Sequence, residues 1–176
     1  KESHGPLGSI TVKKAFEVSS NVAVSMLVYN NYAKNPRQFT DYLYKFGLNK
    51  SLGLQIPGEG MPVIKNPSNR SWSGMSVAQM AYGYEMNLTP LQMLTFYNSV
   101  ANNGKAIAPL FVREIRRLGT PIETFSARVI NEQICSKETL GKVKKMLEGV
   151  VEVGTGKDVI KNPYYKVAGK TGTAQV

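Results

Sequence analysis

Cysteine and histidine are nearly absent from this sequence. Its 176 residues include one of each, Cys135 and His4. One cysteine excludes an internal disulfide framework, and the two residues together are too small a ligand set for a His/Cys metal site. A Ser-His-Asp or Cys-His catalytic centre would have to use His4, because no other histidine exists. We expect Cys135 to be an inert thiol and His4 to be a surface residue.

The sequence also lacks a long apolar run and any block of like charge. No stretch approaches the roughly 18 consecutive apolar residues that can span a bilayer. Lysine and arginine outnumber aspartate and glutamate by 22 to 12, for a net charge of +10, but the basic residues are scattered. We expect solvated faces, no bound nucleic acid, and a general attraction to anionic surroundings such as a cell envelope. A basic nucleic-acid-binding domain remains an alternative that rests on charge alone.

The residues that are present describe one globular domain. Hydrophobic residues make up 42% of the chain and charged residues 19%, and a chain of this length can bury a sizeable core. The sequence begins at Lys1 rather than at an initiator methionine and shows no signal-peptide pattern, and the far end reads as an extended segment without a capping element. We therefore expect a segment of a longer protein.

Apolar periodicity and capping residues predict helices in the first part of the chain. Residues 21–32 are apolar on nearly every side, which predicts a buried helix. Thr89-Pro90-Leu91-Gln92 forms a capping box with proline at the first helical position. The gap at residues 48–73, rich in glycine, proline, asparagine and serine, predicts a long surface loop. The predicted helices cover residues 12–16, 21–32, 36–46, 76–84 and 89–102.

The pattern changes in the second part of the chain. Extended stretches at 111–118 and 122–130 flank Gly119-Thr120-Pro121, which predicts a hairpin. Ser136 is expected to cap an amphipathic helix that ends before Gly154-Thr155-Gly156. A final strand is expected over Tyr165–Ala174.

The final stretch, Ala168–Ala174, contains a lysine among small residues. Gly-Lys-Thr also ends a phosphate-binding P-loop, but that motif needs glycine where this chain has Tyr164. A strand of small residues around Lys170 instead lets a substrate backbone pair along its edge, beside a fixed positive charge. A lysine can also exchange a proton with a serine where no histidine is available.

The serine partner is expected in Glu17–Ala23, at the start of the predicted buried helix. Ser19 or Ser20 would supply the hydroxyl, and Asn21 an amide on the same short turn. Taken alone, Ser-Ser-Asn is more typical of a helix N-cap than of a catalytic motif.

Together the two motifs resemble the second and third motifs of the penicillin-binding protein transpeptidases, S-x-N at Ser19-Ser20-Asn21 and K-T-G at Lys170-Thr171-Gly172. The intervening sequence also resembles the class B, division-type branch of this family. The stretches that carry this likeness include Ile56-Pro57-Gly58-Glu59, Gly83-Tyr84-Glu85, Thr89–Gln92, Tyr97–Gly104 and Gly154-Thr155-Gly156.

The resemblance implies an α/β (α+β) fold of the transpeptidase and β-lactamase type. The chain would form a single, partial domain over 1–176. Residues 1–105 would hold most of the helical part with the S-x-N motif. Residues 106–176 would hold the hairpin, a helix and the K-T-G strand.

The resemblance also implies roles for six residues. Ser19 would relay protons with Lys170, and Asn21 would hold the substrate amide. Thr171, Gly172 and Thr173 would bind the carboxylate of a stem peptide or β-lactam, with the Thr173 backbone N–H in the oxyanion hole. Strict strand alternation would place Lys170 on the face opposite Thr171 and Thr173, so the strand must twist or bulge to bring all three to one site.

One family motif is missing. The nucleophile of the family lies in S-x-x-K upstream of S-x-N, and no Ser-x-x-Lys occurs anywhere in this chain. We expect the chain alone to be inactive. The resemblance assigns it to a membrane-anchored, periplasmic parent that cross-links peptidoglycan stem peptides, is inhibited by β-lactams and works with cell-division envelope proteins. No metal or other cofactor is implied.

Other functions on the same fold stay open. A serine β-lactamase shares these motifs. Two features disfavour it, namely the long stretch between S-x-N and K-T-G, and the Thr89–Gln92 sequence. A β-lactam sensor or a non-catalytic envelope scaffold would keep the fold without the chemistry.

Overall fold

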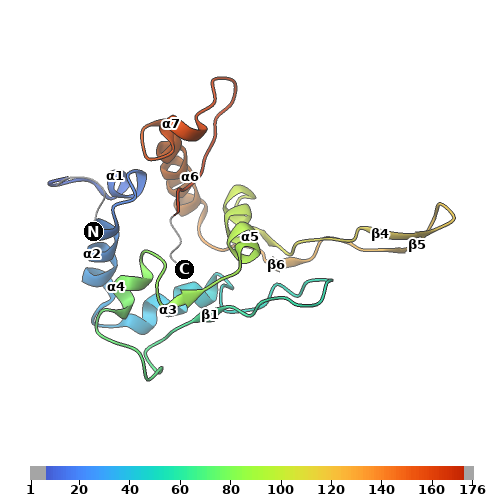
Figure 1. Ribbon diagram of the computed structural model, residues 1–176, viewed down its shortest axis with the longest axis horizontal. Coiled ribbons are helices and arrows are strands. Elements are labelled where there is room, and N and C mark those ends of the chain that lie inside the picture. The colour runs from blue at the N-terminus through green and yellow to red at the C-terminus, as the bar shows by residue number, and fades with distance from the viewer. Residues whose placement is uncertain (1–6, 173–176) are drawn as a thin grey trace.

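The computed structural model describes residues 7–172, which combine helices with short antiparallel strand pairs (Figure 1). The strand pairs are β1 (Val63–Ile64) with β2 (Met86–Asn87), β3 (Ala106–Ile107) with β6 (Val129–Asn131), and β4 (Glu114–Arg117) with β5 (Thr120–Thr124). The helices are α1 (Val12–Glu17), α2 (Asn21–Tyr32), α3 (Pro36–Lys45), α4 (Ser76–Met80), α5 (Pro90–Ala101), α6 (Lys137–Glu152) and α7 (Lys157–Ile160).

Side-chain caps begin the helices where capping residues predict them. The hydroxyl of Thr11 accepts the N–H of Lys14 at 3.1 Å at the start of α1. At the start of α5, the Thr89 hydroxyl accepts the Gln92 N–H at 3.2 Å, and the Gln92 side chain accepts the Thr89 N–H at 2.8 Å. This reciprocal pair confirms the capping box, which satisfies two N–H groups that a helix start leaves without partners.

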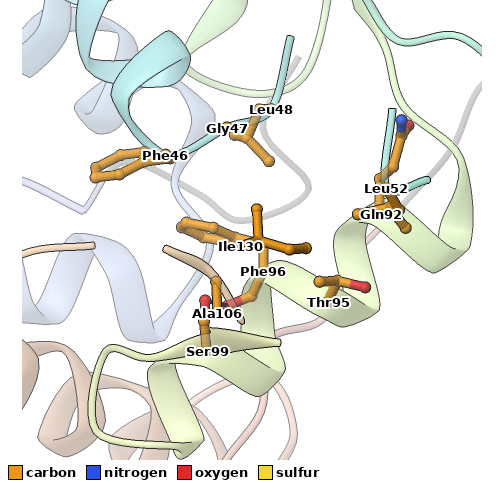
Figure 2. Close-up of a pocket in the computed structure, with 10 residues that line it drawn as sticks. All are labelled: Phe46, Gly47, Leu48, Leu52, Gln92, Thr95, Phe96, Ser99, Ala106 and Ile130. Carbon is orange, nitrogen blue, oxygen red and sulfur yellow. Dashed lines mark hydrogen bonds between the residues drawn. The ribbon is translucent and has the colours of Figure 1, made fainter. Parts of the chain in front are cut away.

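The main core lies between α5, β3 and α6. Its buried members are Val100, Ala106, Ile134, Leu140 and Leu147. Phe46 at the end of α3 and Phe96 of α5 pack against it with their ring centroids 5.5 Å apart. Figure 2 shows these two rings at a small pocket that Leu52, Gln92 and Ile130 also line. Burial of aliphatic and aromatic side chains at this junction holds α6 in place. Because α6 also contacts α1, the segment that follows α6 lies near α1.

The predicted hairpin is confirmed, with shorter strands than expected. Strands β4 and β5 pair in antiparallel register from Glu114↔Thr124 to Arg117↔Thr120, and the hairpin extends away from the helices (Figure 1). Its turn is Leu118-Gly119, both at positive φ (50° and 84°), as a two-residue hairpin turn of type I′ requires. Thr120 and Pro121, expected in the turn, instead belong to β5, and the stretch after it contributes β6, which pairs with β3.

The prediction that residues 21–32 form a helix is confirmed, but the prediction that this helix is buried is wrong. None of the residues of α2 is buried, and Met26 is 58% exposed. The helix contacts α1, α3 and α4, and the described chain supplies nothing to cover its other apolar faces. An apolar pattern on every side indicates that a helix can be buried, but the neighbouring elements determine how much of its surface is covered.

In residues 7–172 no helix combines the length and apolar character that crossing a membrane requires.

Two further boundaries differ from expectation. The helix expected over 76–84 ends at Met80. Its first residue is Ser76, a residue type that often caps helices, and the Ser76 hydroxyl accepts the Ser73 N–H at 2.9 Å. The strand expected over Tyr165–Ala174 is also wrong for residues 165–172, which are irregular, and its last two residues lie outside the described range. A strand needs a neighbouring ladder, and none pairs with this segment among the described residues.

The long loop before α4 is organised by one carboxylate. Glu59 accepts backbone N–H groups from Leu52, from Gly53 at 2.9 Å and from Leu54 at 3.1 Å. Burial of this carboxylate raises its pKa, but the three N–H donors and the charge of Arg128 outweigh that effect and hold the pKa of Glu59 below its usual range. Hydrogen bonds to the ionised form favour it.

Replacing Glu59 with glutamine is therefore expected to lower the hydrogen-exchange protection of the Leu52–Leu54 amides by roughly fivefold, because a neutral acceptor binds N–H groups less strongly than a charged one. The pKa of Glu59 is lower in the folded than in the unfolded chain, so in the wild type this protection is present above the unfolded-state pKa and is lost as pH falls through the folded-state pKa. Protection factors measured across that range test both effects. Glu123→Gln on the exposed strand β5 is the control and should change nothing in this loop.

Candidate active site

The junction of α1 and α2 fixes the two serines of the S-x-N motif in different directions. Ser20 is the N-cap of α2, and its hydroxyl accepts the Ala23 N–H at 3.2 Å. Ser19 precedes it at a φ of 54°, a left-handed conformation rare for residues with a side chain. Its N–H donates to the Phe16 carbonyl at 3.2 Å. This sharp turn directs the Ser19 side chain away from α2 and toward the end of the chain.

Lys170 meets Ser19 at that turn. Its ammonium Nζ donates to Ser19 Oγ at 2.5 Å and to the Thr171 carbonyl at 3.1 Å. The same Nζ lies 5.6 Å from the centroid of the Phe16 ring. The neighbouring Gly169 N–H donates to the Leu147 carbonyl of α6 at 3.2 Å, which ties this segment to the core.

The environment of Lys170 disfavours its charged form. The side chain is half-buried, and burial lowers the pKa of Lys170 below its usual range. An ammonium with a lowered pKa gives up a proton more readily, and Ser19 Oγ, in direct contact, can take that proton once Ser19 has given up its own.

Two threonine hydroxyls complete the cluster. Thr171 Oγ1 lies 3.1 Å from Ser19 Oγ, and Thr155 Oγ1 lies 2.7 Å from Thr171 Oγ1 and 3.5 Å from Ser19 Oγ. Ser19, Thr155, Thr171 and Lys170 therefore form one hydrogen-bonded group, assembled from the α1–α2 turn, the turn after α6 and the last described segment. We call these four residues the hydroxyl cluster.

The irregular backbone at 165–172 explains how neighbouring residues reach one site. In a regular strand Lys170 and Thr171 would point to opposite faces. Here both side chains contact Ser19, because the segment is not held in a ladder.

The remaining predicted site residues are placed as follows. Asn21 is the first residue of α2 and is exposed. Gly172 is exposed, with open space where a side chain would begin. Thr173 lies outside the described residues.

Thr155 is the member of the hydroxyl cluster to which sequence reasoning assigned no role. Its signal was the Gly154-Thr155-Gly156 motif, which contributed to the family resemblance and was otherwise interpreted only as a helix end. Gly154 shows why that motif packs here, since a side chain at this position would clash with the Glu17 carbonyl oxygen of α1. The close approach brings Thr155 beside Ser19.

The hydroxyl cluster has the direct amine–hydroxyl contact that a serine–lysine proton relay requires. An amine in contact with a hydroxyl can exchange a proton with it, and the threonines supply further hydrogen-bonding oxygens. Residues 7–172 contain no group of three His, Cys, Asp or Glu side chains placed to hold a metal ion. The pocket in Figure 2 is separate, since none of the residues drawn there belongs to the hydroxyl cluster.

The chain belongs to the penicillin-binding protein transpeptidase domain family, whose model matches residues 1–176. The sequence is 34% identical over 174 residues to penicillin-binding protein PbpB of Mycobacterium tuberculosis, and 30% identical over 168 residues to peptidoglycan D,D-transpeptidase FtsI of Escherichia coli. Each alignment covers 94% of this chain, and 24% and 26% of the two relatives. The chain thus spans about a quarter of the length of these relatives.

Solved structures show the same fold. The D,D-transpeptidase domain from Eggerthella lenta superposes with a TM-score of 0.82 at 27% identity, over 98% of this chain and 43% of that one. Penicillin binding protein 3 from Mycobacterium tuberculosis, complexed with ampicillin, superposes with a TM-score of 0.78 at 32% identity, over 94% and 36%. These likenesses confirm the predicted fold class, a partial transpeptidase fold of helices and short strands.

Proposed function

We propose that this chain is one part of a penicillin-binding D,D-transpeptidase, a single partial domain over 1–176 that carries the S-x-N and K-T-G motifs. The contact between Lys170 Nζ and Ser19 Oγ at 2.5 Å is the observation that carries this proposal, because it joins the two motifs across 151 residues. Family membership over the whole chain supports it. The apolar faces of α2 that the described chain leaves open agree with a larger domain.

The hydroxyl cluster suits the proton transfers of acyl exchange. When Ser19 gives its hydroxyl proton to a leaving nitrogen, the Lys170 ammonium can restore it through their direct hydrogen bond. Asn21 would hold the amide of the acyl donor. Thr171, Gly172 and Thr173 would receive its carboxylate, with the Thr173 N–H as an oxyanion donor.

The acylated nucleophile would come from outside this chain. The family motif S-x-x-K does not occur among its 176 residues, so the isolated chain is expected to be inactive. A serine on a segment upstream of Lys1 in the full protein would complete the site. The proposal thus assigns to this chain the relay and the carboxylate site, and to the rest of the protein the covalent step.

The substrates and partners follow from the same assignment. Peptidoglycan stem peptides would be cross-linked, and β-lactams would acylate the same serine. The related penicillin binding protein 3, which is complexed with ampicillin, supports β-lactam binding. The likeness to FtsI and PbpB favours a role in cell division with envelope partners. Such a protein would work on the extracytoplasmic face of the membrane, anchored by a segment outside this chain.

The test is to incubate the full protein with a fluorescent penicillin and to map the adduct by peptide mass spectrometry. We expect one stable adduct per molecule, on a serine of an S-x-x-K sequence upstream of Lys1. No adduct would contradict the transpeptidase function and favour a non-catalytic scaffold. Rapid release of hydrolysed penicillin would instead identify a β-lactamase. A stable adduct without cross-linking of stem peptides would identify a sensor.

A further inference from the structure

Thr155 belongs to the hydroxyl cluster, although the proposed proton relay gives it no task. It lies between two glycines in the turn after α6 and is half-buried. Its Oγ1 makes the shortest of the three hydroxyl–hydroxyl contacts in the cluster, 2.7 Å to Thr171 Oγ1, against 3.1 Å and 3.5 Å for the other two. The structure therefore places an additional hydroxyl where it can orient the others.

The backbone holds Thr155 firmly against the S-x-N turn. Its N–H donates to the Glu17 carbonyl at 3.1 Å, two residues before Ser19. Gly156 N–H donates to the Val150 carbonyl at 2.9 Å. Gly154 has no room for a side chain against Glu17. The main chain on both sides thus fixes the Thr155 backbone relative to Ser19, and the contact with Thr171 holds its Oγ1.

A count of hydrogens in the cluster shows what this hydroxyl can do. The Lys170 ammonium can only donate to Ser19 Oγ, whereas each hydroxyl carries one hydrogen and can accept from others. If Thr155 donates to Thr171, then Thr171 turns its own hydrogen toward Ser19. Ser19 Oγ then accepts from both Lys170 and Thr171. Its hydrogen can point out of the cluster, because the remaining acceptor there, Thr155 Oγ1, lies 3.5 Å away, at the far limit of a hydrogen bond. The reverse chain would direct the hydrogen of Ser19 to Thr171, away from any substrate.

We propose that Thr155 is a positioning residue of this site, which holds the Thr171 hydroxyl so that the hydrogen of Ser19 faces the reacting atoms. This inference rests on the proposed transpeptidase function. In the transfer it serves, the O–H bond of Ser19 breaks as its proton goes to the leaving nitrogen, and a proton from Lys170 Nζ restores it. Thr155 keeps its own hydrogen throughout and is not consumed.

The experiment compares three variants of the full protein in stopped-flow acylation by a fluorescent penicillin, which separates the acylation rate constant from the dissociation constant of the first complex. Thr155→Val keeps the shape of the side chain and removes the hydroxyl. We expect it to lower the acylation rate constant roughly tenfold, because one positioning hydrogen bond is lost, and to change the dissociation constant little. Thr155→Ser should restore the rate to within roughly threefold of wild type. Thr124→Val, on the exposed end of β5, is the matched control and should behave as wild type.

The outcomes separate this inference from the function on which it rests. If wild-type protein forms no adduct, the proposed function fails and the inference falls with it. If wild type is acylated and Thr155→Val reacts at the same rate, only the inference is overturned. It is also overturned if the variant weakens the first complex without slowing acylation, because Thr155 would then contact the ligand itself. A rate that serine does not restore would show that the loss is one of packing.

Discussion

Replacing Lys170 with alanine is expected to lower the rate of penicillin acylation of the full protein by roughly a thousandfold, within the range that positioned acid–base groups contribute. Lys170 is the one amine in contact with Ser19 among the described residues, at 2.5 Å. Without it, no neighbouring amine can return a proton to Ser19 Oγ after Ser19 has donated its own. Labelling with a fluorescent penicillin, followed over time, measures the rate directly.

The controls for Lys170 separate chemistry from folding. Burial lowers the pKa of Lys170 because it disfavours the ammonium, so removing that charge also removes a cost from the folded state and should not unfold the protein. Circular dichroism of the variant checks this. Lys142→Ala removes an exposed lysine of α6 that pairs with Glu138 at 2.6 Å, and it should keep the wild-type rate. Wild-type acylation by Lys170→Ala would disprove the relay.

Replacing Gly154 with alanine is expected to destabilise the protein by about 2–3 kcal/mol, the scale of overpacking at a site that cannot yield. The added methyl group would clash with the Glu17 carbonyl oxygen and lie 2.9 Å from Val150 Cα. Both neighbours are backbone, so relief requires α1 and α6 to separate. Urea unfolding measures the loss, and acylation should fall too, because the turn carries Thr155 away from Ser19.

A second glycine of the same region provides the matched control. Gly141 lies inside α6 with nothing within 4 Å of an added side chain. Gly141→Ala should therefore stabilise the protein by about 0.5–1 kcal/mol, since alanine favours the helix over glycine. Equal effects of the two substitutions would show that the approach of the turn to Glu17 is not what Gly154 provides.

Helix starts were predictable because their causes are local. The Thr89–Gln92 capping box and the N-cap at Ser136 each join residues three positions apart, and both occur in the structure. The hairpin was predictable for the same reason, although its turn fell one residue earlier than expected, at Leu118-Gly119.

Predictions that depended on distant partners failed. The all-apolar pattern of α2 indicated burial, but burial requires neighbours on every side, and the contacts with α1, α3 and α4 leave every residue of α2 at least partly exposed. Residues 165–172 have a strand-like sequence without a strand beside them, so they remain irregular. In both cases the sequence pattern indicated a structure that the segment can adopt, while the neighbouring elements determined whether it is buried or paired.

The sequence by itself determined the family, through two short motifs and the stretches between them, and it determined the helix starts through local caps. The family resemblance already favoured Ser19 over Ser20. Only the tertiary structure shows how the two serines differ, since the Ser20 hydroxyl caps α2 while the Ser19 hydroxyl contacts Lys170. It alone also added Thr155 to the site. The physical reason is that these contacts join residues 136 to 152 positions apart. Such residues become neighbours only when α1 packs against α6, and local rules of spacing or propensity do not predict that packing.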